Sequence, residues 1–325
     1  MRRLLGIVFA CVILAVSPRA EGQGSNTWPV RPIRLIVPTG AGAATDIMAR
    51  LLANGIGSGL GQSVVVENMP GASGLLAHQA VAHAQPDGYT LLFTNTSGMS
   101  INPISFKALP YDPARDFAAI AMVCSLGPQM LSVNADLPVK TVPEFFDYAR
   151  AHRGKLPIGF DNTAGAAAFA TKLLNRRADL DLVEVPYRAA AQMTQDAASG
   201  VVQVLMSSIA AAGPMVESGK LRPLAVTSPS RFPALPDLPA VGEFAPGVVV
   251  NGWFAVVAPA ATPSDAVARL NREIAAYLNT MDIQQRLYAF GLATEGAGTP
   301  EGTAQFIHAD QERWRRLAAE LDIRP

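Results

Sequence analysis

The chain has 325 residues, half of them apolar, with 26 basic and 26 acidic residues. This length exceeds the usual size of one domain, and the apolar content is sufficient for substantial cores, which argues against intrinsic disorder. The balanced charge provides no basic excess that would favour nucleic acid as a partner. We therefore expect a globular protein with two lobes and no nucleic-acid partner.

The N-terminal segment has the layout of a secretory signal peptide. Arg2 and Arg3 precede an uncharged stretch over residues 4–16, and small residues follow up to Ala20. A membrane anchor is the alternative, but a spanning helix needs about 20 apolar residues. Cys11 leaves a lipoprotein signal as a further alternative. We expect residues 1–26 to direct export and to be absent from the mature protein.

Strand-like and helix-like segments alternate in the first part of the chain. Residues 33–38, 63–68 and 89–95 form short β-rich runs bounded by Gly, Pro or Asn. Helical patterns over residues 45–60 and 73–84 lie between these runs. The resulting βαβαβ order predicts a parallel sheet with right-handed crossovers.

A second series of strands and helices begins near residue 129. Residues 129–134 predict a strand, and residues 141–152 predict a helix with a capping box formed by Thr141 and Glu144. Residues 157–160 then lead through a small-residue turn into another helix. Further strands are expected over residues 182–187, 202–207, 221–228 and 251–259, and further helices over residues 263–278 and 300–321, capped by Thr262 and Thr299.

Two such series predict an α/β protein with two lobes, each a mostly parallel sheet flanked by helices, and a ligand cleft between them. We assign residues 27–128 and 252–325 to the first lobe, because the late helices need a sheet to pack on, and residues 129–251 to the second. Ligands of open α/β sheets bind beyond the carboxyl ends of the strands. The turns that follow the strands are therefore the candidate binding elements.

The turn at Gly40–Thr45 is rich in glycine and alanine and precedes a helix. Such a turn lets backbone N–H groups converge, and a helix N-terminus favours an anion. Asp46 at the start of the helix is expected to have a structural role. A dinucleotide site is the alternative, with Glu67 in place for a ribose contact, but Thr45 replaces the third glycine of that fingerprint.

Candidates for catalysis and metal binding are few. His78 and His83 are five residues apart, do not match a metalloprotease motif, and are expected on a helix surface. Cys124 lies in an apolar run and is expected to be a buried, inert thiol. We therefore expect no catalytic residues, no metal and no cofactor, which favours a binding protein over an enzyme.

Several segments together resemble a known family. They include "RPIRLIVPTGAGAATDIMARLL", "GQSVVVENMPGASG" and "RFPALPDLPAVGE", in this order. The chain resembles the Bug receptors, the substrate-binding proteins of tripartite tricarboxylate transporters. The resemblance implies a two-lobed periplasmic binding protein, type II-like and monomeric, which closes on a small carboxylate and delivers it to a membrane transporter. An exported α/β enzyme acting on carboxylates, and a sensor that docks a membrane kinase, remain alternatives.

The family motifs also indicate binding residues and departures from the pattern. The first turn of the family, Pro-Phe-x-x-Gly-Gly-x-x-Asp, matches residues 38–46, with Thr39 in place of phenylalanine. The second, Gly-Asn-Gly-Ser-Ser-Ser-His, matches residues 162–168, where Gly165 and three alanines replace the serines and the histidine. A Phe-Asp-Asn segment matches residues 206–208, so its acid is replaced by Ser207. These losses predict an aromatic or hydrophobic carboxylate rather than aspartate, glutamate or citrate.

The predicted site combines both turns with the end of the strand over residues 89–95 and two further positions. Backbone N–H groups of the turns are expected to hold the carboxylate. The predicted ligand-binding residues are Thr39, Gly40, Ala41, Gly42, Thr45, Asp46, Thr94, Asn95, Thr96, Ser97, Thr163, Ala164, Gly165, Ala166, Tyr187 and Ser207.

Overall fold

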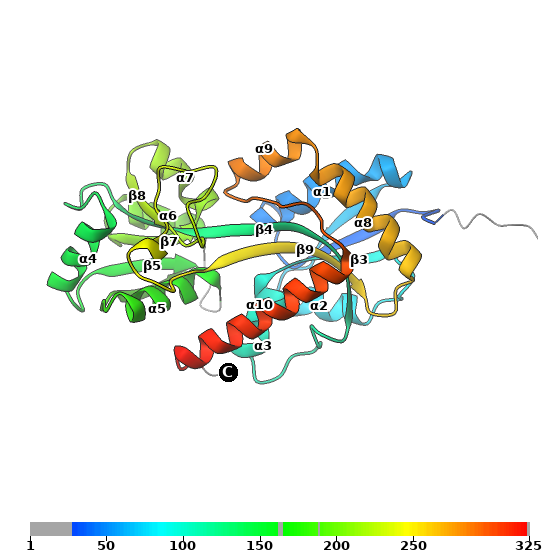
Figure 1. Ribbon diagram of the computed structural model, residues 1–325, viewed down its shortest axis with the longest axis horizontal. Helices are drawn as coiled ribbons and strands as arrows, with labels where there is room; N and C mark the ends of the chain where they lie inside the picture. Colours follow the sequence, from blue (N-terminus) through cyan, green and yellow to red (C-terminus); the bar gives the residue numbers. More distant parts are fainter. Residues whose placement is uncertain (1–27, 162–164, 188, 324–325) are drawn as a thin grey trace, which may run out of the picture.

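The computed structural model describes residues 28–161, 165–187 and 189–323 (Figure 1). The predicted signal peptide, and Thr163 and Ala164 of the predicted site, lie outside these residues. Within the described part of the chain, no helix combines the length and the apolar character needed to cross a membrane.

The described residues form a mixed sheet with the strand order β2-β1-β3-β9-β4-β7-β5-β6, and β8 also pairs with β4. The pairs of β1 with β2 and β3, and of β5 with β6 and β7, are parallel, as the sequence predicts. The pairs formed by β4 and β9 are antiparallel. The strands are β1 (Ile33–Val37), β2 (Val64–Asn68), β3 (Thr90–Asn95), β4 (Phe117–Asn134), β5 (Pro157–Asp161), β6 (Val183–Tyr187), β7 (Val204–Ser208), β8 (Leu221–Val226) and β9 (Asn251–Pro259).

Strand β4 connects two groups of strands. It pairs with β9 along Phe117–Pro128 and with β7 and β8 along Gln129–Asn134. The sequence predicts only the second stretch, because Gly127 and Pro128 interrupt the pattern. Register shifts between β4 and β9 accommodate this interruption. Figure 1 shows β4 and β9 running across the middle of the molecule between the two groups.

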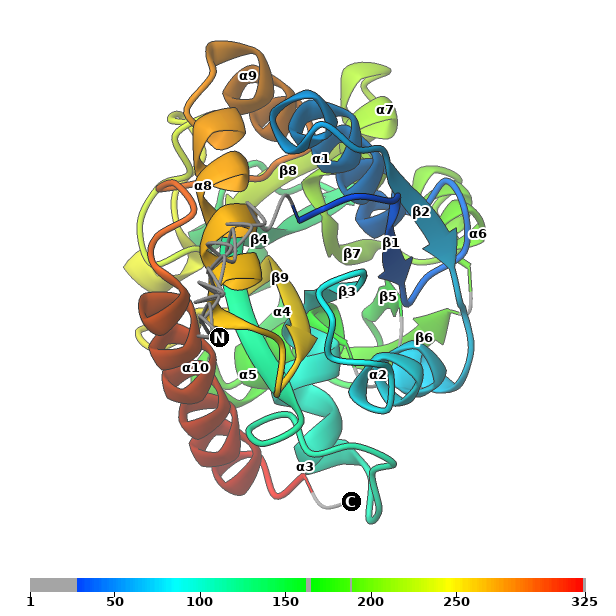
Figure 2. The same cartoon turned by 90° about the vertical axis from the view of Figure 1, so that its right-hand side faces the viewer.

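The first region comprises β1, β2, β3 and the adjoining parts of β4 and β9. Ile33, Leu35 and Val37 alternate onto the face covered by α1 and α8, whereas Ile36 packs on the opposite face with α2. Figure 2 shows this arrangement end-on. The helices of this region are α1 (Ala44–Leu60), α2 (Leu75–Ala82), α3 (Asn102–Ser105), α8 (Ser264–Leu278) and α9 (Met281–Ala289), with short helical turns η1 (Ala72–Gly74) and η2 (Ser97–Ile101).

The second region comprises β5 to β8 and the end of β4. Its first helix begins as predicted: the Thr141 hydroxyl accepts a hydrogen bond from the Glu144 N–H (3.3 Å). The Glu144 carboxylate reaches back to the N–H of Lys140 (2.7 Å), one residue before the cap. The helices of this region are α4 (Val142–Ala151), α5 (Ala166–Arg177), α6 (Ala190–Ala198) and α7 (Ile209–Glu217), with the short turn η3 (Val241–Glu243).

The C-terminal helix α10 (Pro300–Glu320) packs on both regions. Ile307 belongs to the core that contains Trp253, whereas Trp314 lies in the core of the second region, edge-on to Phe169 with ring centroids 4.8 Å apart. The sequence placed all of residues 252–325 with the first lobe. A helix that contributes to both cores ties the two regions together along one side.

The predicted helix caps have different outcomes. Thr299 caps α10 by accepting a hydrogen bond from the N–H of Gly302 (3.0 Å), as expected. Thr262 as a cap is wrong: its hydroxyl donates to the carbonyl oxygen of Pro259 (2.7 Å), and Pro263 occupies the capping position of α8. The hydroxyl proton of Thr262 is therefore used by the turn that precedes the helix, and α8 has no side-chain cap. Helix α9 was not anticipated.

Candidate ligand-binding site

A cavity of about 240 Å³ lies where the two regions meet. Its walls combine helix N-termini, strand ends and a loop that follows α9. This volume is slightly below the range of drug-sized ligand pockets, roughly 300–1,000 Å³, and therefore suits a smaller organic molecule. The lining residues are Ala44, Thr45, Asn95, Thr96, Ser97, Gly127, Pro128, Gln129, Asp161, Gly165, Ala166, Ala167, Ser208, Ile209, Ala210, Gly252, Trp253, Phe254, Phe290, Gly291 and Leu292.

The structure brings part of the predicted site together at this cavity. These residues come from the start of α1, the end of β3 and the start of α5, which are far apart in the sequence. The predicted residues that line the cavity are Thr45, Asn95, Thr96, Ser97, Gly165 and Ala166.

The first turn itself lies beside the cavity. Gly40, Ala41 and Gly42 are exposed and do not line it. The N–H of Gly42 donates to the Asp46 carboxylate (2.9 Å), so this donor already has an acceptor. Thr39 uses its carbonyl oxygen to accept a hydrogen bond from Asn68 (3.0 Å). The turn therefore shapes the start of α1, and the donors at the cavity belong to the residues that follow.

Two helices from opposite regions direct their N-termini at the cavity. The first hydrogen bond of α1 runs from the Ile47 N–H to the carbonyl oxygen of Ala43 (3.0 Å), and that of α5 from Phe169 to Gly165 (3.2 Å). The preceding N–H groups, those of residues 44–46 and 166–168, therefore have no acceptor within their helices. Unpaired N–H groups and the positive ends of two helix dipoles favour an anion between them.

The chain matches the family described as "Tripartite tricarboxylate transporter family receptor" over residues 48–323. The BugT protein of Bordetella pertussis is 32% identical over 328 residues, covering 98% of this chain and 98% of BugT. This chain belongs to that receptor family. It is a solute-binding receptor of the two-lobed periplasmic type, and the predicted resemblance to the Bug receptors is confirmed.

Solved structures agree with this assignment. The structure described as R. palustris Rpa4515 with adipate is 34% identical to the receptor, with a TM-score of 0.84, and the match covers 92% of this chain and 99% of that one. MatC (Rpa3494) from Rhodopseudomonas palustris with bound malate is 30% identical, with a TM-score of 0.77 and coverage of 89% and 99%. These comparisons give no support to the enzyme or kinase-docking alternatives.

Asp46 has the structural role that the sequence suggested. The residue is 2% exposed, and its carboxylate accepts hydrogen bonds from Gly42, Arg50 (3.1 Å) and Asn68 (2.8 Å). Burial by itself would raise the pKa of this carboxyl, but the hydrogen bonds outweigh burial and lower the pKa below its usual value. The negative charge of Asp46 is thus neutralised within the protein. Asp46 was also predicted to be a ligand contact, but it does not line the cavity.

Thr94 is fully buried and does not line the cavity. Its hydroxyl forms a hydrogen bond with a buried histidine instead. The Thr94 hydroxyl is 2.8 Å from Nε2 of His78, whose Nδ1 is 2.8 Å from the carbonyl oxygen of Gly74. The expectation of a surface position for His78 is therefore wrong: the residue is fully buried and stacks on Tyr111. Burial lowers the pKa of His78 to about 4, so the ring is neutral near pH 7.

Two other predicted residues have partners outside the cavity. The Tyr187 hydroxyl donates to the Asp196 carboxylate (2.9 Å), and neither residue lines the cavity. Ser207 is buried in β7, where its hydroxyl is 3.3 Å from the carbonyl oxygen of Ser208. Since alternate residues of a strand face opposite sides, Ser208, the next residue, reaches the cavity instead.

Sequence reasoning missed an acid in the cavity. Asp161, the last residue of β5, lines it, so the premise that the site lacks an acid is incorrect. The position could have been found, because it ends a strand just before a predicted binding turn. The aromatic wall of Trp253, Phe254 and Phe290 had no comparable local signal, since these residues reach the cavity only through long-range packing.

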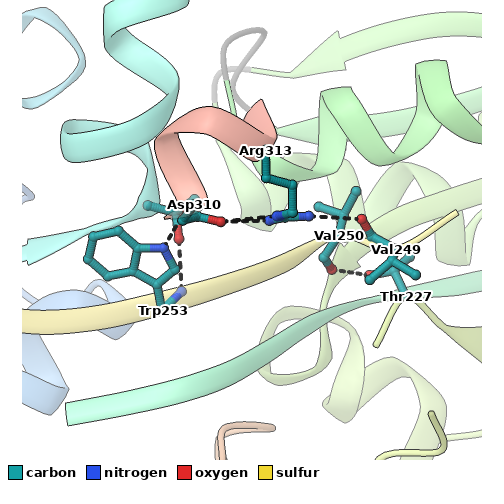
Figure 3. A network of polar contacts seen from close by, with 7 residues as sticks. Thr227, Val249, Val250, Trp253, Asp310 and Arg313 are labelled. Carbon is teal, nitrogen blue, oxygen red and sulfur yellow. Dashed lines mark hydrogen bonds and ion pairs between the residues drawn. The ribbon is translucent and has the colours of Figure 1, made fainter. Parts of the chain in front are cut away.

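A polar network connects the cavity to the crossing strands (Figure 3). The N–H of Trp253 donates to the Thr96 hydroxyl (2.8 Å), and its indole Nε1 donates to Asp310 of α10 (2.7 Å). Asp310 is ion-paired with Arg313 (2.9 Å), which donates to the carbonyl oxygen of Val249 (3.2 Å). Helix α10 thereby holds Trp253 in place and braces the segment that leads into β9.

The structure also places the residues that the sequence raised for other kinds of chemistry. Glu67, the candidate ribose ligand of a dinucleotide site, is ion-paired with Arg34 (2.7 Å) on the neighbouring strand. Cys124 is buried as expected, and burial raises the pKa of its thiol to about 12, so that it stays protonated. Among the described residues, His, Cys, Asp and Glu side chains do not gather into a group that could hold a metal ion.

Proposed function

We propose that the receptor captures a small organic carboxylate in the cavity between its two regions and passes it, chemically unchanged, to a membrane transporter. The observation that carries the proposal is the convergence of the N-termini of α1 and α5 on one cavity. The receptor acts as a monomer in the periplasm, after export directed by residues 1–26.

A carboxylate is the anion that best fits these donors. Several backbone N–H groups and the hydroxyls of Thr45 and Ser97 offer short, charge-assisted hydrogen bonds that do not require an arginine. The described residues that line the cavity include no lysine or arginine. The similar proteins with bound adipate and malate also hold carboxylates, which supports the same ligand class here.

The body of the ligand is aromatic or hydrophobic. Phe254, Phe290 and Leu292 supply apolar surface, and Ala166 and Ala167 leave space where polar side chains stand in the family motif. Burying a polar group without a partner costs about 1–3 kcal/mol, which corresponds to roughly one or two decades in affinity. An apolar body avoids this cost, so benzoate-like acids should bind more tightly than aspartate or citrate.

Calorimetry with matched ligands tests the proposal. Benzoate and benzamide have nearly the same shape, but only benzoate carries the negative charge that the helix N-termini favour. We expect benzoate-like acids to bind and their amides to bind at least about 10-fold more weakly. Equal affinity for acid and amide, or no binding of any carboxylate in a broad thermal-shift screen, would contradict the proposal. The bound acid should be recovered unchanged after prolonged incubation, which tests the absence of turnover.

A further inference from the structure

The one ionisable side chain among the described cavity-lining residues is an acid, in a site that favours anions. Asp161 ends β5 and stands four residues before Gly165, which precedes helix α5. None of the described residues forms an ion pair with it. Its carboxylate accepts a hydrogen bond from its own backbone N–H, which carries no full charge, so among the described residues its negative charge is left for a ligand to meet.

The charges around the cavity differ between its two sides. A helix N-terminus contributes about half a positive charge. On the first-region side α1 supplies this charge, and the nearby Asp46 is neutralised by Arg50 at 3.0 Å. On the second-region side the N-termini of α5 and α7 contribute about one positive charge together, and an ionised Asp161 cancels it. One side of the cavity is thus electropositive and the other is close to neutral.

We propose that Asp161 makes the second-region side of the cavity a hydrogen-bond acceptor, so that the receptor prefers a carboxylate whose far end carries a hydroxyl or amino group over a ligand with a second carboxylate. This inference rests on the proposed function and specifies the ligand further. A hydroxyl or amino donor pairs with the Asp161 carboxylate, whereas a second carboxylate meets a like charge. The aromatic or hydrophobic body lies between the two ends.

Two ligand series test the inference by changing only the far end. One series consists of benzoate, 4-hydroxybenzoate, 4-(aminomethyl)benzoate and terephthalate, and the other of hexanoate, its terminal hydroxy and amino derivatives, and adipate. We expect the hydroxy or amino member of a series to bind about 10-fold or more tightly than the dicarboxylate. Comparing the hydroxy ligand with the amino ligand of one series shows whether the site prefers a neutral hydrogen-bond donor or a positively charged one.

The variant Asp161→Asn removes the charge at nearly constant shape. It should raise affinity for the dicarboxylates about 10-fold and reduce the advantage of the donor ligands. Glu217→Gln is the matched control, because it removes the same charge from the exposed, far end of α7. This control should leave every affinity unchanged, and circular dichroism should show that both variants fold.

The pH dependence of binding provides an independent measurement. Burial raises the pKa of Asp161 above its usual value, which brings protonation closer to neutral pH. As the pH is lowered toward this raised pKa, protonation of Asp161 should weaken binding of the hydroxy ligands and strengthen binding of the dicarboxylates. Asp161→Asn should abolish both trends.

Within residues 28–161, 165–187 and 189–323, the other charged groups of the surrounding elements have partners or lie at the far ends of their helices. Tyr187 lies opposite Asp161 in the pairing of β5 with β6, and its hydroxyl donates to the Asp196 carboxylate. Burial and the contact with Asp196 raise the pKa of Tyr187 to about 12, so Tyr187 stays neutral near pH 7. Glu184 is ion-paired with Lys172 of α5 (2.7 Å). The remaining cations of α5, at positions 176 and 177, lie in its last turn.

The outcomes separate the two proposals. If dicarboxylates bind as tightly as the donor ligands and Asp161→Asn changes neither, the inference about Asp161 is overturned while carboxylate binding stands. If no member of either series binds, including benzoate and hexanoate, the proposed function fails, and the inference fails with it. Opposite pH trends for hydroxy ligands and dicarboxylates that disappear in Asp161→Asn would support the inference.

Discussion

The two walls of the cavity are built from different chemistry. The first-region wall presents the side-chain oxygens of Thr45, Asn95, Thr96 and Ser97 next to the N-terminus of α1. The second-region wall presents Gly165 and alanines at the N-terminus of α5, together with the acid Asp161. The first wall has four adjacent side chains that can hydrogen-bond, whereas the second combines backbone donors with the Asp161 carboxyl, Gln129 and a Ser208 hydroxyl that already caps α7.

This difference indicates a division of labour between the walls. Side-chain hydroxyls and an uncancelled helix dipole suit a carboxylate, which every ligand of the proposed class has in common. The alanine-rich wall sets shape and charge for the part of the ligand that varies. The first wall should therefore determine whether an acid binds, and the second should determine which acid binds.

The largest expected effect comes from removing one N–H at the start of each helix. Proline is compatible with the first position of a helix, and Ala43 (ψ 155°) and Gly165 (ψ 172°) have the extended backbone that proline requires before it. We expect Ala44→Pro to weaken carboxylate binding about 10- to 100-fold, because it removes a donor to a charged group. Ala166→Pro should have a smaller effect that depends on the ligand. Calorimetry measures both.

The control for these variants is Ser264→Pro, at the first position of α8, which does not line the cavity. It should leave affinity unchanged. If Ala166→Pro weakens all acids as much as Ala44→Pro does, the two walls share the carboxylate and the division of labour is wrong.

Lowering the pH should destabilise the folded protein around His78, which supports the first-region wall of the cavity. His78 packs against the backbone of Gly98, next to Ser97, and leaves no room for a side chain there. Since its native pKa of about 4 lies below the unfolded value near 6.5, the unfolded chain binds the proton first as the pH falls. Between about pH 7.5 and pH 5 this linkage should lower the free energy of unfolding by about 2 kcal/mol. Chemical denaturation at several pH values measures the change.

Two histidine variants identify the group responsible for this dependence. His78→Gln should remove this part of the pH dependence, although it also lowers the stability at pH 7.5. His152→Gln is the control, because it makes the same replacement at an exposed position at the end of α4. A slope that persists in His78→Gln would assign the acid sensitivity to other groups.

The smallest expected effects come from removing one side-chain hydroxyl from each wall of the cavity. Thr96→Val leaves the buried N–H of Trp253 without its acceptor, which should cost about 1–2 kcal/mol of stability and also weaken binding. Ser208→Ala removes the side-chain cap of α7, which should cost about 1 kcal/mol of stability with affinity changed less than about threefold. Denaturation and calorimetry on both variants are needed. Equal losses of affinity would contradict the contrast between the walls.

The fold was predictable where local signals and long-range packing agree. The β-rich runs, the small-residue turns and the Thr141 and Thr299 caps appear directly in the sequence, and they locate helices α4 and α10. The continuous strand β4 was not predictable, because Gly127 and Pro128 resemble a break until β9 and β7 are present to pair on either side. Tertiary pairing overrides the local signal there.

The site was predictable to the extent that it follows strand ends. This rule found Asn95, Thr96 and Ser97, and it would have found Asp161 had it been applied to β5. It could not distinguish residues that line the cavity from neighbours that support them. Thr94 and Gly42 are of the second kind, because their polar groups are taken by His78 and Asp46, contacts that depend on tertiary structure.

The place of Trp253 gives the receptor an intrinsic optical reporter. The chain has three tryptophans. Trp253 lines the cavity, Trp314 is buried in the second-region core, and the ring of Trp28 lies tilted against that of Tyr89 in the first region. Emission from Trp253 should therefore respond to a ligand, while the other two provide a constant background. Replacing Trp28 and Trp314 with phenylalanine would leave a single fluorophore in the cleft, with which binding can be followed on the millisecond scale without attaching a dye.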